Sequence, residues 1–300
     1  ILWEPFSDRF NDKYDIKRNL YKNLYGNVVI FEEELLDVGL VFRCQWNSSN
    51  QFGFVRKSTL INNSDIDLNI HFLDGIQNIV PFGVGSDLQN STSNLVDAYK
   101  RSELETKSGL GIYALSAIIV DKAEPSEALK CNIVWSLGVN NPTYLLSSKQ
   151  LNAFRNKQKI IQETDVKGEK GAYFVVSSIL LNKHQTESWK IVANVNQNHA
   201  QVISLANDII SNNKAIENDL IADVNLGTKN LMALNATADG FQFTADKRKD
   251  TRHFANVLFN IMRGGVFDEN YQIDKNDFVS YLENANKSVY EKHTDFIQNL

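Results

Sequence analysis

Apolar and polar residues alternate along much of the chain between residues 27 and 195. Val38, Leu40, Phe42, Cys44 and Trp46 stand at every second position, with mostly polar or small residues between them. Alternation with a period of two is typical of a strand that has one buried face and one wet face. The pattern predicts strands over residues 38–47, 52–61, 66–72, 110–120, 129–137, 173–181 and 189–195.

Short polar turns join several of these strands, and consecutive strands joined in this way pair antiparallel. The strands at 110–120 and 173–181 are apolar on both phases, which is typical of central strands between two layers. We therefore predict a mainly β fold, a large antiparallel β-sandwich rather than a parallel sheet with crossover helices. Residues 1–25 show no clean period and are expected to lie across the sheet as an aromatic-rich lead-in.

The segment from Asp74 to Glu105 interrupts this series of strands. It is rich in Gly, Asn and paired charge, and we predict that it forms a compact loop with one short helix. Loops held on a rigid sheet are where function tends to lie. Residues 74–105 are therefore expected to be an insertion in the sandwich that carries binding residues.

After Asn196 the apolar period changes to that of a helix. Helices are predicted over residues 199–210, 216–234 and 254–262, and a last helical pattern runs from 278 to 300. The change divides the chain into a sandwich domain at 1–196 and a helical linker or extension at 197–300. Because the chain opens on Ile1 instead of Met and its last helical pattern lacks a cap signal, we expect a fragment that leads to a catalytic domain.

Composition and charge exclude some classes of partner. The 300 residues are 43% hydrophobic and carry a net charge of -5, with the basic residues dispersed, which argues against nucleic acid and anionic membranes. The sequence contains neither an apolar run of membrane length nor a secretory signal pattern. Cys44 and Cys131 fall on apolar strand phases, so we predict two buried thiols.

Sequence signatures of nucleotide, zinc or nucleophile chemistry are missing, so neither a catalytic residue nor a metal ligand is assigned. Residues 268–277 resemble a calcium loop but carry Ile273 where the turn glycine belongs. Asp121, Glu124 and Glu127 surround Pro125 and could act as a general acid and base, although such residues more often cap turns.

Polar residues of the 74–105 insertion are the first candidates for contact with a ligand. Gln89, Asn94, Asp97 and Tyr99 could contact sugar hydroxyls or a neighbouring domain. Asp97 and Arg101 stand at the i, i+4 spacing that lets residues of one helix pair. The alternative is a solvated helix face whose charges pair with each other.

His253 and Arg263 are the other candidates, on a predicted helix that ends at Gly264 and Gly265. We expect His253 to be a hydrogen-bonded interface residue rather than a catalytic one. Arg263 lies in the last turn, where a cation interacts favourably with the negative end of the helix. Either residue could instead anchor a following domain.

The tryptophans of three predicted strands are Trp46, Trp135 and Trp189. Each falls on the strand phase that faces the core, so packing is their expected role. They would be platforms for sugar rings only if exposed.

Several short strings carry a resemblance to a known family. They are Trp3-Glu4-Pro5-Phe6, Leu20-Tyr21-Lys22-Asn23, residues 53–56, residues 74–81 from Asp74 to Pro81, residues 94–100, residues 121–129 and residues 256–265. These strings resemble the N-terminal part of cellobiose-phosphorylase-like proteins, which are related to glycoside hydrolase family 94. The resemblance runs through most of the chain.

The resemblance implies a galactose-mutarotase-like supersandwich, then a helical linker, then an (α/α)6 barrel. In that family the barrel holds the catalytic acid and the residues that bind phosphate. The chain shows no match to the barrel, so the resemblance assigns no catalytic residue and no cofactor here, although the parent protein could use inorganic phosphate. It also implies a β-linked glucoside as substrate of the parent protein, a possible homodimer and the bacterial cytoplasm.

The function expected from these observations is that of a non-catalytic domain that shapes the substrate cleft and makes domain or subunit contacts. One alternative is a stand-alone carbohydrate-binding module, which requires a Trp or Tyr exposed on a sheet face. A less favoured one is an enzyme of the sugar-epimerase kind that uses His71 or His184, although neither has an obvious carboxylate partner in the sequence pattern.

Overall fold

The computed structural model describes residues 1–91, 93–117, 129–265 and 272–300. The chain forms two compact units. The first contains residues 1–23 and 27–227, and the second contains residues 24–26 and 228–300. The two units are described separately.

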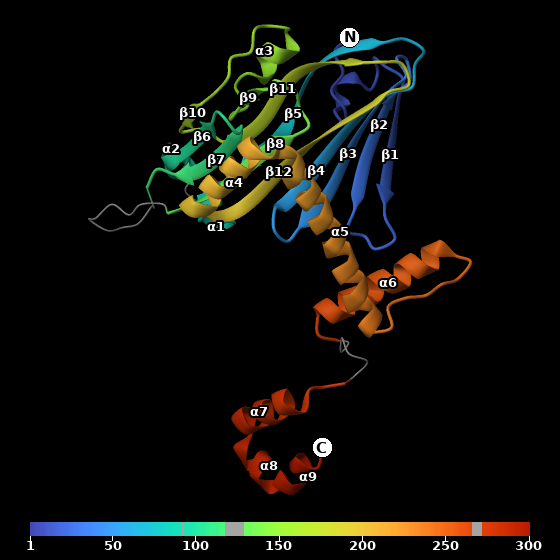
Figure 1. Ribbon diagram of the computed structural model, residues 1–300, viewed down its shortest axis with the longest axis vertical. Helices are drawn as coiled ribbons and strands as arrows, with labels where there is room; N and C mark the ends of the chain where they lie inside the picture. The colour runs from blue at the N-terminus through green and yellow to red at the C-terminus, as the bar shows by residue number, and fades with distance from the viewer. Residues whose placement is uncertain (92, 118–128, 266–271) are drawn as a thin grey trace. The chain divides into compact units, whose positions relative to one another are not determined.

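The first unit is built on a sheet of nine antiparallel strands (Figure 1). In spatial order these are β1 (Ile16–Lys22), β2 (Val29–Leu35), β3 (Leu40–Ser49), β4 (Gly53–Asn62), β12 (Thr186–Asn198), β8 (Lys130–Leu137), β7 (Leu110–Leu115), β6 (Lys100–Glu105) and β10 (Asp165–Lys167). The residues between β7 and β8 at 118–128 lie outside the described chain, and so do the carboxylates predicted around Pro125.

A smaller sheet packs against one face of the large one. It contains β5 (Leu68–Ile79), β11 (Gly171–Leu181) and β9 (Thr143–Leu145), with β11 in the middle. Buried side chains of both sheets interdigitate, among them Phe42, Phe72, Tyr173 and Trp189. We call the covered face of the large sheet its inner face. Two antiparallel sheets around a shared core confirm the predicted β-sandwich.

Helices cover the outer face of the large sheet. Helix α4 (His199–Ser211) and the first part of α5 (Asn213–Thr237) pack Ile209, Ile216 and Leu220 against strand residues that include Trp135. Asn198 and Gln201 form a capping box, which explains why the helix begins where β12 ends. The predicted change of period near Asn196 therefore marks the end of the last strand, while the first compact unit continues to Gly227.

The segment from Asp74 to Glu105 differs from its prediction at both ends. Strand β5 continues to Ile79, and β6 already begins at Lys100, so the connection is shorter than predicted. It contains two short helices, α1 (Ser86–Ser91) and α2 (Ser93–Tyr99), rather than one. Pairing of β5 with β11 as far as Ile79 overrides the local turn preference of Gly75 and Asn78.

The lead-in contains a strand that the sequence pattern did not predict. Among the residues that the structure describes, strand β1 pairs with β2 alone, at the edge of the large sheet. Two of its side chains, those of Ile16 and Leu20, are aliphatic. A strand with few buried side chains has no alternating apolar signal. Residues before it do lie across the sheet, as predicted, because Phe6 packs on Phe31 and Phe42.

The second unit is helical. It contains the end of α5, α6 (Lys247–Met262), α7 (Lys275–Ala285), α8 (Lys287–Lys292) and α9 (Thr294–Gln298). Tyr25 packs against Phe241 and Phe254, and the Asn235 amide donates to the Phe254 carbonyl. The helices predicted at 199–210 and 216–234 are confirmed as α4 and α5. The helix predicted at 254–262 begins earlier, at Lys247, and the pattern predicted at 278–300 is divided among α7, α8 and α9.

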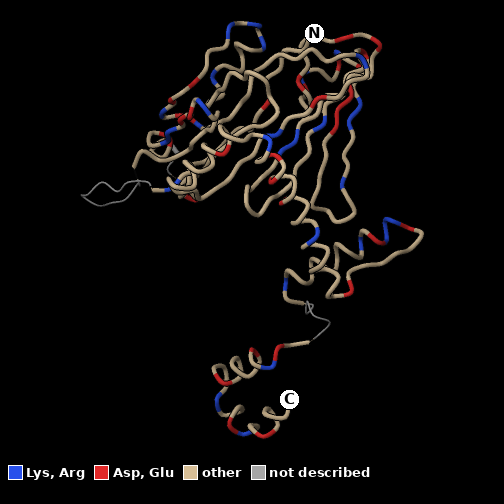
Figure 2. Tube along the Cα trace, viewed as in Figure 1, with Lys and Arg blue, Asp and Glu red and all other residues tan. Residues whose placement is uncertain are grey.

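Charge and cysteine burial agree with the sequence predictions. Figure 2 shows Lys and Arg interleaved with Asp and Glu along the described chain. Cys44 and Cys131 are both buried and free, as predicted. Among the described helices, none has the length and apolar character needed to cross a membrane.

Candidate functional site

A groove in the first unit runs beside β5, the edge strand of the small sheet. Its volume is about 560 Å³, within the size range of ligand sites. We define the N-terminal strap as residues 2–6, and the edge groove as the space between this strap, β5 and the inner face of the large sheet. Its lining is mainly apolar, with aromatic residues Trp3, Phe6, Phe42, Phe72, Phe154, Phe174 and Trp189.

A buried ion pair forms the floor of the edge groove. The Arg56 Nη2 atom lies 2.7 Å from Asp74 Oδ1, and the other carboxylate oxygen accepts hydrogen bonds of 2.7 Å from Ser58 and from the Trp189 indole. Arg56 also donates to Cys44 Sγ at 3.0 Å. Burial alone would lower the pKa of Arg56, but the adjacent Asp74 carboxylate raises it above its ordinary value. Both carboxylate oxygens of Asp74 are therefore engaged by donors.

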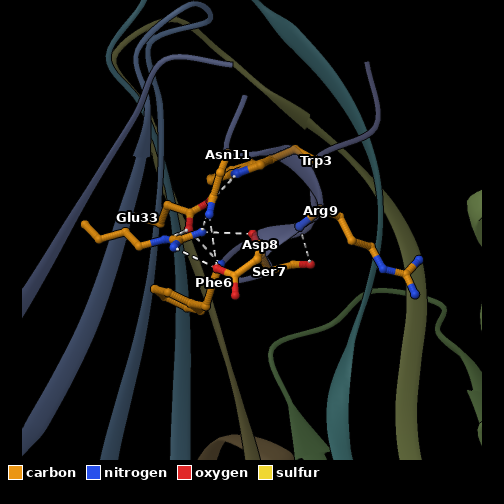
Figure 3. Close-up of polar contacts among 8 residues, drawn as sticks. Trp3, Phe6, Ser7, Asp8, Arg9, Asn11 and Glu33 are labelled. Atoms are coloured by element: carbon orange, nitrogen blue, oxygen red, sulfur yellow. Dashed lines mark hydrogen bonds and ion pairs between the residues drawn. The ribbon is translucent and has the colours of Figure 1, made fainter. Parts of the chain in front are cut away.

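A second buried carboxylate, Glu33, holds the N-terminal strap (Figure 3). Glu33 is 0% exposed and accepts hydrogen bonds from Trp3 Nε1 at 2.6 Å, the Phe6 backbone N–H at 2.7 Å and Arg18 Nε at 2.8 Å. Arg18 also donates to the Ser7 carbonyl at 2.8 Å. Phe6 has a φ of 66°, a strained value for a bulky residue, and these contacts hold it there.

The strap is also fastened at its other side. Arg155 of α3 (Leu151–Arg155) makes two hydrogen bonds to the Glu4 carboxylate, at 2.7 and 3.2 Å. His71 of β5 packs against the same helix, with its ring centroid 5.1 Å from that of Phe154, and its Nδ1 lies 2.9 Å from Ser178 Oγ. The strap thus spans from the large sheet to the helix on the small one through side-chain contacts.

The charged groups that line the edge groove pair with one another. Its two described carboxylates, Glu4 and Asp74, are each paired with a guanidinium group. A general acid or base needs a proton-transfer position beside a reacting group, and both carboxylates are already occupied by these partners. Apolar walls with a few fixed polar groups are typical of a ligand-binding pocket.

The structure brings two of the predicted contact residues together. Lys100 is buried and its ammonium donates to Gln89 Oε1 and Asp97 Oδ1, both at 2.7 Å. Asn94 is exposed and Tyr99 half-buried. These residues lie in the connection between β5 and β6, as expected, but Lys100 is the centre of the cluster.

The predicted pair of Asp97 with Arg101 is wrong. Helix α2 ends at Tyr99, so Arg101 lies on strand β6 and the helical spacing does not apply. Its guanidinium instead pairs with Glu103 at 2.9 Å and with Asp165 of β10 at 3.1 Å.

His253 and Arg263 belong to the second unit, where their contacts are local. His253 Nε2 lies 2.9 Å from the Asp239 carbonyl oxygen of the same unit, so the residue is hydrogen-bonded as predicted, while its role at an interface stays a prediction. Arg263 follows α6, and its guanidinium lies 5.2 Å from the centre of the Phe259 ring.

Two predictions about single residues need correction. Trp135 and Trp189 are buried as predicted, but Trp46 is 36% exposed because the shared core of the two sheets ends before it. His184 does have a carboxylate partner, with Nε2 3.2 Å from Asp65 Oδ1 on an exposed turn.

Sequence reasoning missed Glu33, Arg56 and Arg155. A signal existed for Arg56, because it occupies the same strand phase as Ser58 and Leu60, which face the core. A charged residue on an apolar phase predicts a buried partner. Arg155 gave no such signal, because its partner Glu4 is far away in the sequence.

Comparisons with known proteins match the chain at its C-terminal end. A family model described as glycoside hydrolase family 149 insertion domain 1 matches residues 267–300. This match agrees with the resemblance to glycoside-hydrolase-related proteins that the sequence strings indicated. No curated protein sequence matches the chain.

Solved structures with some likeness come from carbohydrate-processing proteins. A putative kojibiose phosphorylase from human microbiome shares 9% identity at a TM-score of 0.33, over 81% of this chain and 25% of that one. A bacterial glucoamylase complexed with acarbose shares 10% identity at a TM-score of 0.45, over 81% and 32%. The chain thus spans a quarter to a third of the length of these structures.

Proposed function

We propose that this chain is a non-catalytic domain of a larger carbohydrate-active protein related to glycoside phosphorylases. The observation that carries the proposal is the family-model match at residues 267–300. A sandwich followed by helices also agrees with the domain order that the sequence resemblance implies. In this proposal an (α/α)6 barrel outside the chain performs the reaction on a β-linked glucoside, with inorganic phosphate as co-substrate, in a cytoplasmic and possibly dimeric protein.

The domain's part in this proposal is to shape the barrel's substrate cleft and to make domain or subunit contacts. The candidate residues for those contacts are Gln89, Asn94, Asp97, Tyr99, Arg101, His253 and Arg263. The Lys100 ammonium orients the Gln89 and Asp97 side chains through its two hydrogen bonds.

Phosphate release and consumption with a panel of β-linked glucose disaccharides tests the proposal. The 300-residue chain and the full-length protein are assayed side by side. We expect turnover only in the longer protein, because the carboxylates of the edge groove are occupied. Turnover by the 300-residue chain itself would contradict a non-catalytic role.

A stand-alone carbohydrate-binding module is the second candidate, and Trp46 favours it. Its side chain is 36% exposed on the inner face of β3. The same face carries Phe31 of β2, Phe54 of β4 and Leu20 of β1, which are 42%, 57% and 64% exposed. Aromatic side chains on a sheet face can stack against sugar rings. Glycan-array binding by the chain alone, lost in Trp46→Ala, would favour this candidate.

A further inference from the structure

Strand β5 is a long free edge in the described structure. It pairs with β11 from Leu68 to Ile79, and the described chain supplies no strand to its other side. The backbone N–H and C=O groups on that side therefore face the edge groove without a ladder partner. Such a row of groups is a template for another extended segment.

The other edges of the two sheets carry the usual protection against such pairing. Strands β9 and β10 have three residues each, and β1 carries Lys17, Arg18 and Lys22. Short length and charged side chains are how natural sheets discourage edge pairing. β5 has 12 residues without Lys, Arg or Pro, and its one acidic residue, Asp74, faces the large sheet and pairs with Arg56.

A local irregularity protects only the far end of β5. Asn78 has a φ of 57°, and the register with β11 shifts at this point. A bulge of this kind disrupts pairing locally. Residues 68–76 keep a regular register with β11, so the open edge is about nine residues long, longer than an average strand.

The strap covers this edge without pairing to it. Its hydrogen bonds go to Glu33 of β2 and to Arg155 of α3, and the described backbone bonds include none between residues 2–6 and β5. The strap therefore leaves the backbone of β5 without a ladder partner while it encloses the edge groove. Among the described side-chain contacts, Arg56 Nη1 donates to the Gly75 carbonyl at 3.2 Å, so this one group is already engaged. Because the strap is held by side-chain hydrogen bonds, it can move away from β5 without the loss of any backbone hydrogen bond between strands.

The side chains on the two faces of β5 determine which pattern of apolar and polar residues a strand added beside it would need. Ile70 and Phe72 face the core between the sheets, whereas Asn69, His71 and Gln77 are exposed. Side chains of an added strand alternate in the same way, because directly opposed residues share a face of the sheet. An acceptable partner is thus an extended segment whose apolar residues alternate with polar ones.

We propose that the edge groove is a strand-accepting site in which the free edge of β5 binds an extended peptide segment of another polypeptide by β-augmentation. The segment pairs its backbone with residues 68–76 and buries its apolar side chains against the groove lining that includes Phe42 and Trp189. This inference rests on the geometry of β5 and is independent of the proposed carbohydrate function.

A lone segment fits this site better than a second copy of the chain. The strap lies on one side of the edge and Phe154 and Arg155 lie on the other. A second folded copy would present its own β5 behind the same two walls, and edge-to-edge approach would bring these walls together. An extended segment has no such walls.

The test uses the whole chain and a synthetic peptide of about eight residues in which Val and Thr alternate between terminal lysines. A control peptide has the same side chains but N-methyl groups on alternate amides, which removes half of the backbone donors. We expect the control to bind at least about tenfold more weakly in calorimetry, because several hydrogen bonds are lost. Bound peptide should slow amide exchange in β5 and leave β1 unchanged.

Protein variants locate the site. His71→Lys should weaken binding several-fold, while Ile66→Lys, an exposed position just before β5, should leave it unchanged. Arg155→Met should strengthen binding several-fold by releasing the strap. Equal affinity of the two peptides, protection of β1 in place of β5, or a doubled mass without peptide in sedimentation would each overturn the proposal.

Discussion

β1 and β5 each end a sheet, and they are protected from further pairing in different ways. β1 carries its protection in its own sequence, as three basic side chains on seven residues. β5 lacks such residues, and the strap held by Glu33 and Arg155 covers it instead. Protection by charge is permanent, whereas protection by a fastened segment can be released. The difference predicts that changes near β5 act on binding and stability together.

Removal of the Asp74 carboxylate, which β5 points toward the large sheet, is expected to have the largest effect on stability. Asp74→Ala should lower the free energy of unfolding by about 3–5 kcal/mol, because the buried Arg56 loses the only carboxylate with which it forms an ion pair in the described structure. Chemical denaturation measures this change. The matched change near β1 is Glu34→Ala, which breaks the more exposed pair with Lys17 and should cost less than about 1 kcal/mol.

A double variant separates charge from packing. Arg56→Met with Asp74→Leu should recover most of the lost stability, because it leaves no charge unpaired in the core. If the double variant is less stable than Asp74→Ala, the polar contacts with Ser58 and Trp189 matter more than the ion pair.

Release of the strap is expected to have a smaller effect. Glu33→Gln weakens the charge-assisted hydrogen bonds from Trp3, Phe6 and Arg18, at a cost of roughly 2 kcal/mol. Hydrogen exchange at residues 2–7 should become faster while β5 stays paired with β11. Asp8→Asn, which changes an exposed side chain near the same arginine, serves as the control. Unchanged exchange at residues 2–7 in Glu33→Gln would mean that the strap is held by packing.

Self-association should follow from release of the strap. Trp3→Ser removes a side chain that fastens the strap and lines the edge groove, so light scattering should show several-fold faster aggregation at high protein concentration. Adding His71→Lys should suppress it. Lys17→Thr at β1 should aggregate less than Trp3→Ser, because two basic residues of that edge remain.

The smallest expected effect is a pH dependence at the β1 edge. Burial alone would raise the pKa of Glu32, but hydrogen bonds from Arg43, Asn19 and Tyr21 lower it overall. A lowered pKa in the folded state stabilises the fold above the unfolded value of about 4.3, and this contribution is lost as pH falls through the folded value. Acid titration of unfolding stability should therefore be shallower in Glu32→Gln than in the unchanged chain.

The sequence predicted those parts of the fold whose signals are local. The alternation at Leu40, Phe42 and Cys44 and the period change near Asn196 identified strands and helices at nearly their observed bounds. The sequence pattern did not predict β1, because an edge strand buries few side chains and so shows no apolar alternation. The sequence did not predict the edge groove, because the residues that form it, such as Glu4 with Arg155 and Trp3 with Glu33, are far apart in the sequence and meet only in the folded chain.

Trp46 shows that a correctly predicted strand phase does not determine whether a side chain is buried. Its strand phase was correct, since it shares the inner face with Phe42 and Cys44. Its exposure depends on how far the small sheet extends, which alternation within β3 does not encode. Exposure of a correctly phased residue is thus a property of the assembled layers.

Residue-resolved hydrogen exchange along β5 tests the central claim most directly. If the edge is free, amides that face β11 exchange slowly and the alternate amides of residues 68–76 exchange fast. At Phe174–Val176, where β11 is paired on both sides, every amide should be slow. Slow exchange at every position of residues 68–76 would contradict a free edge.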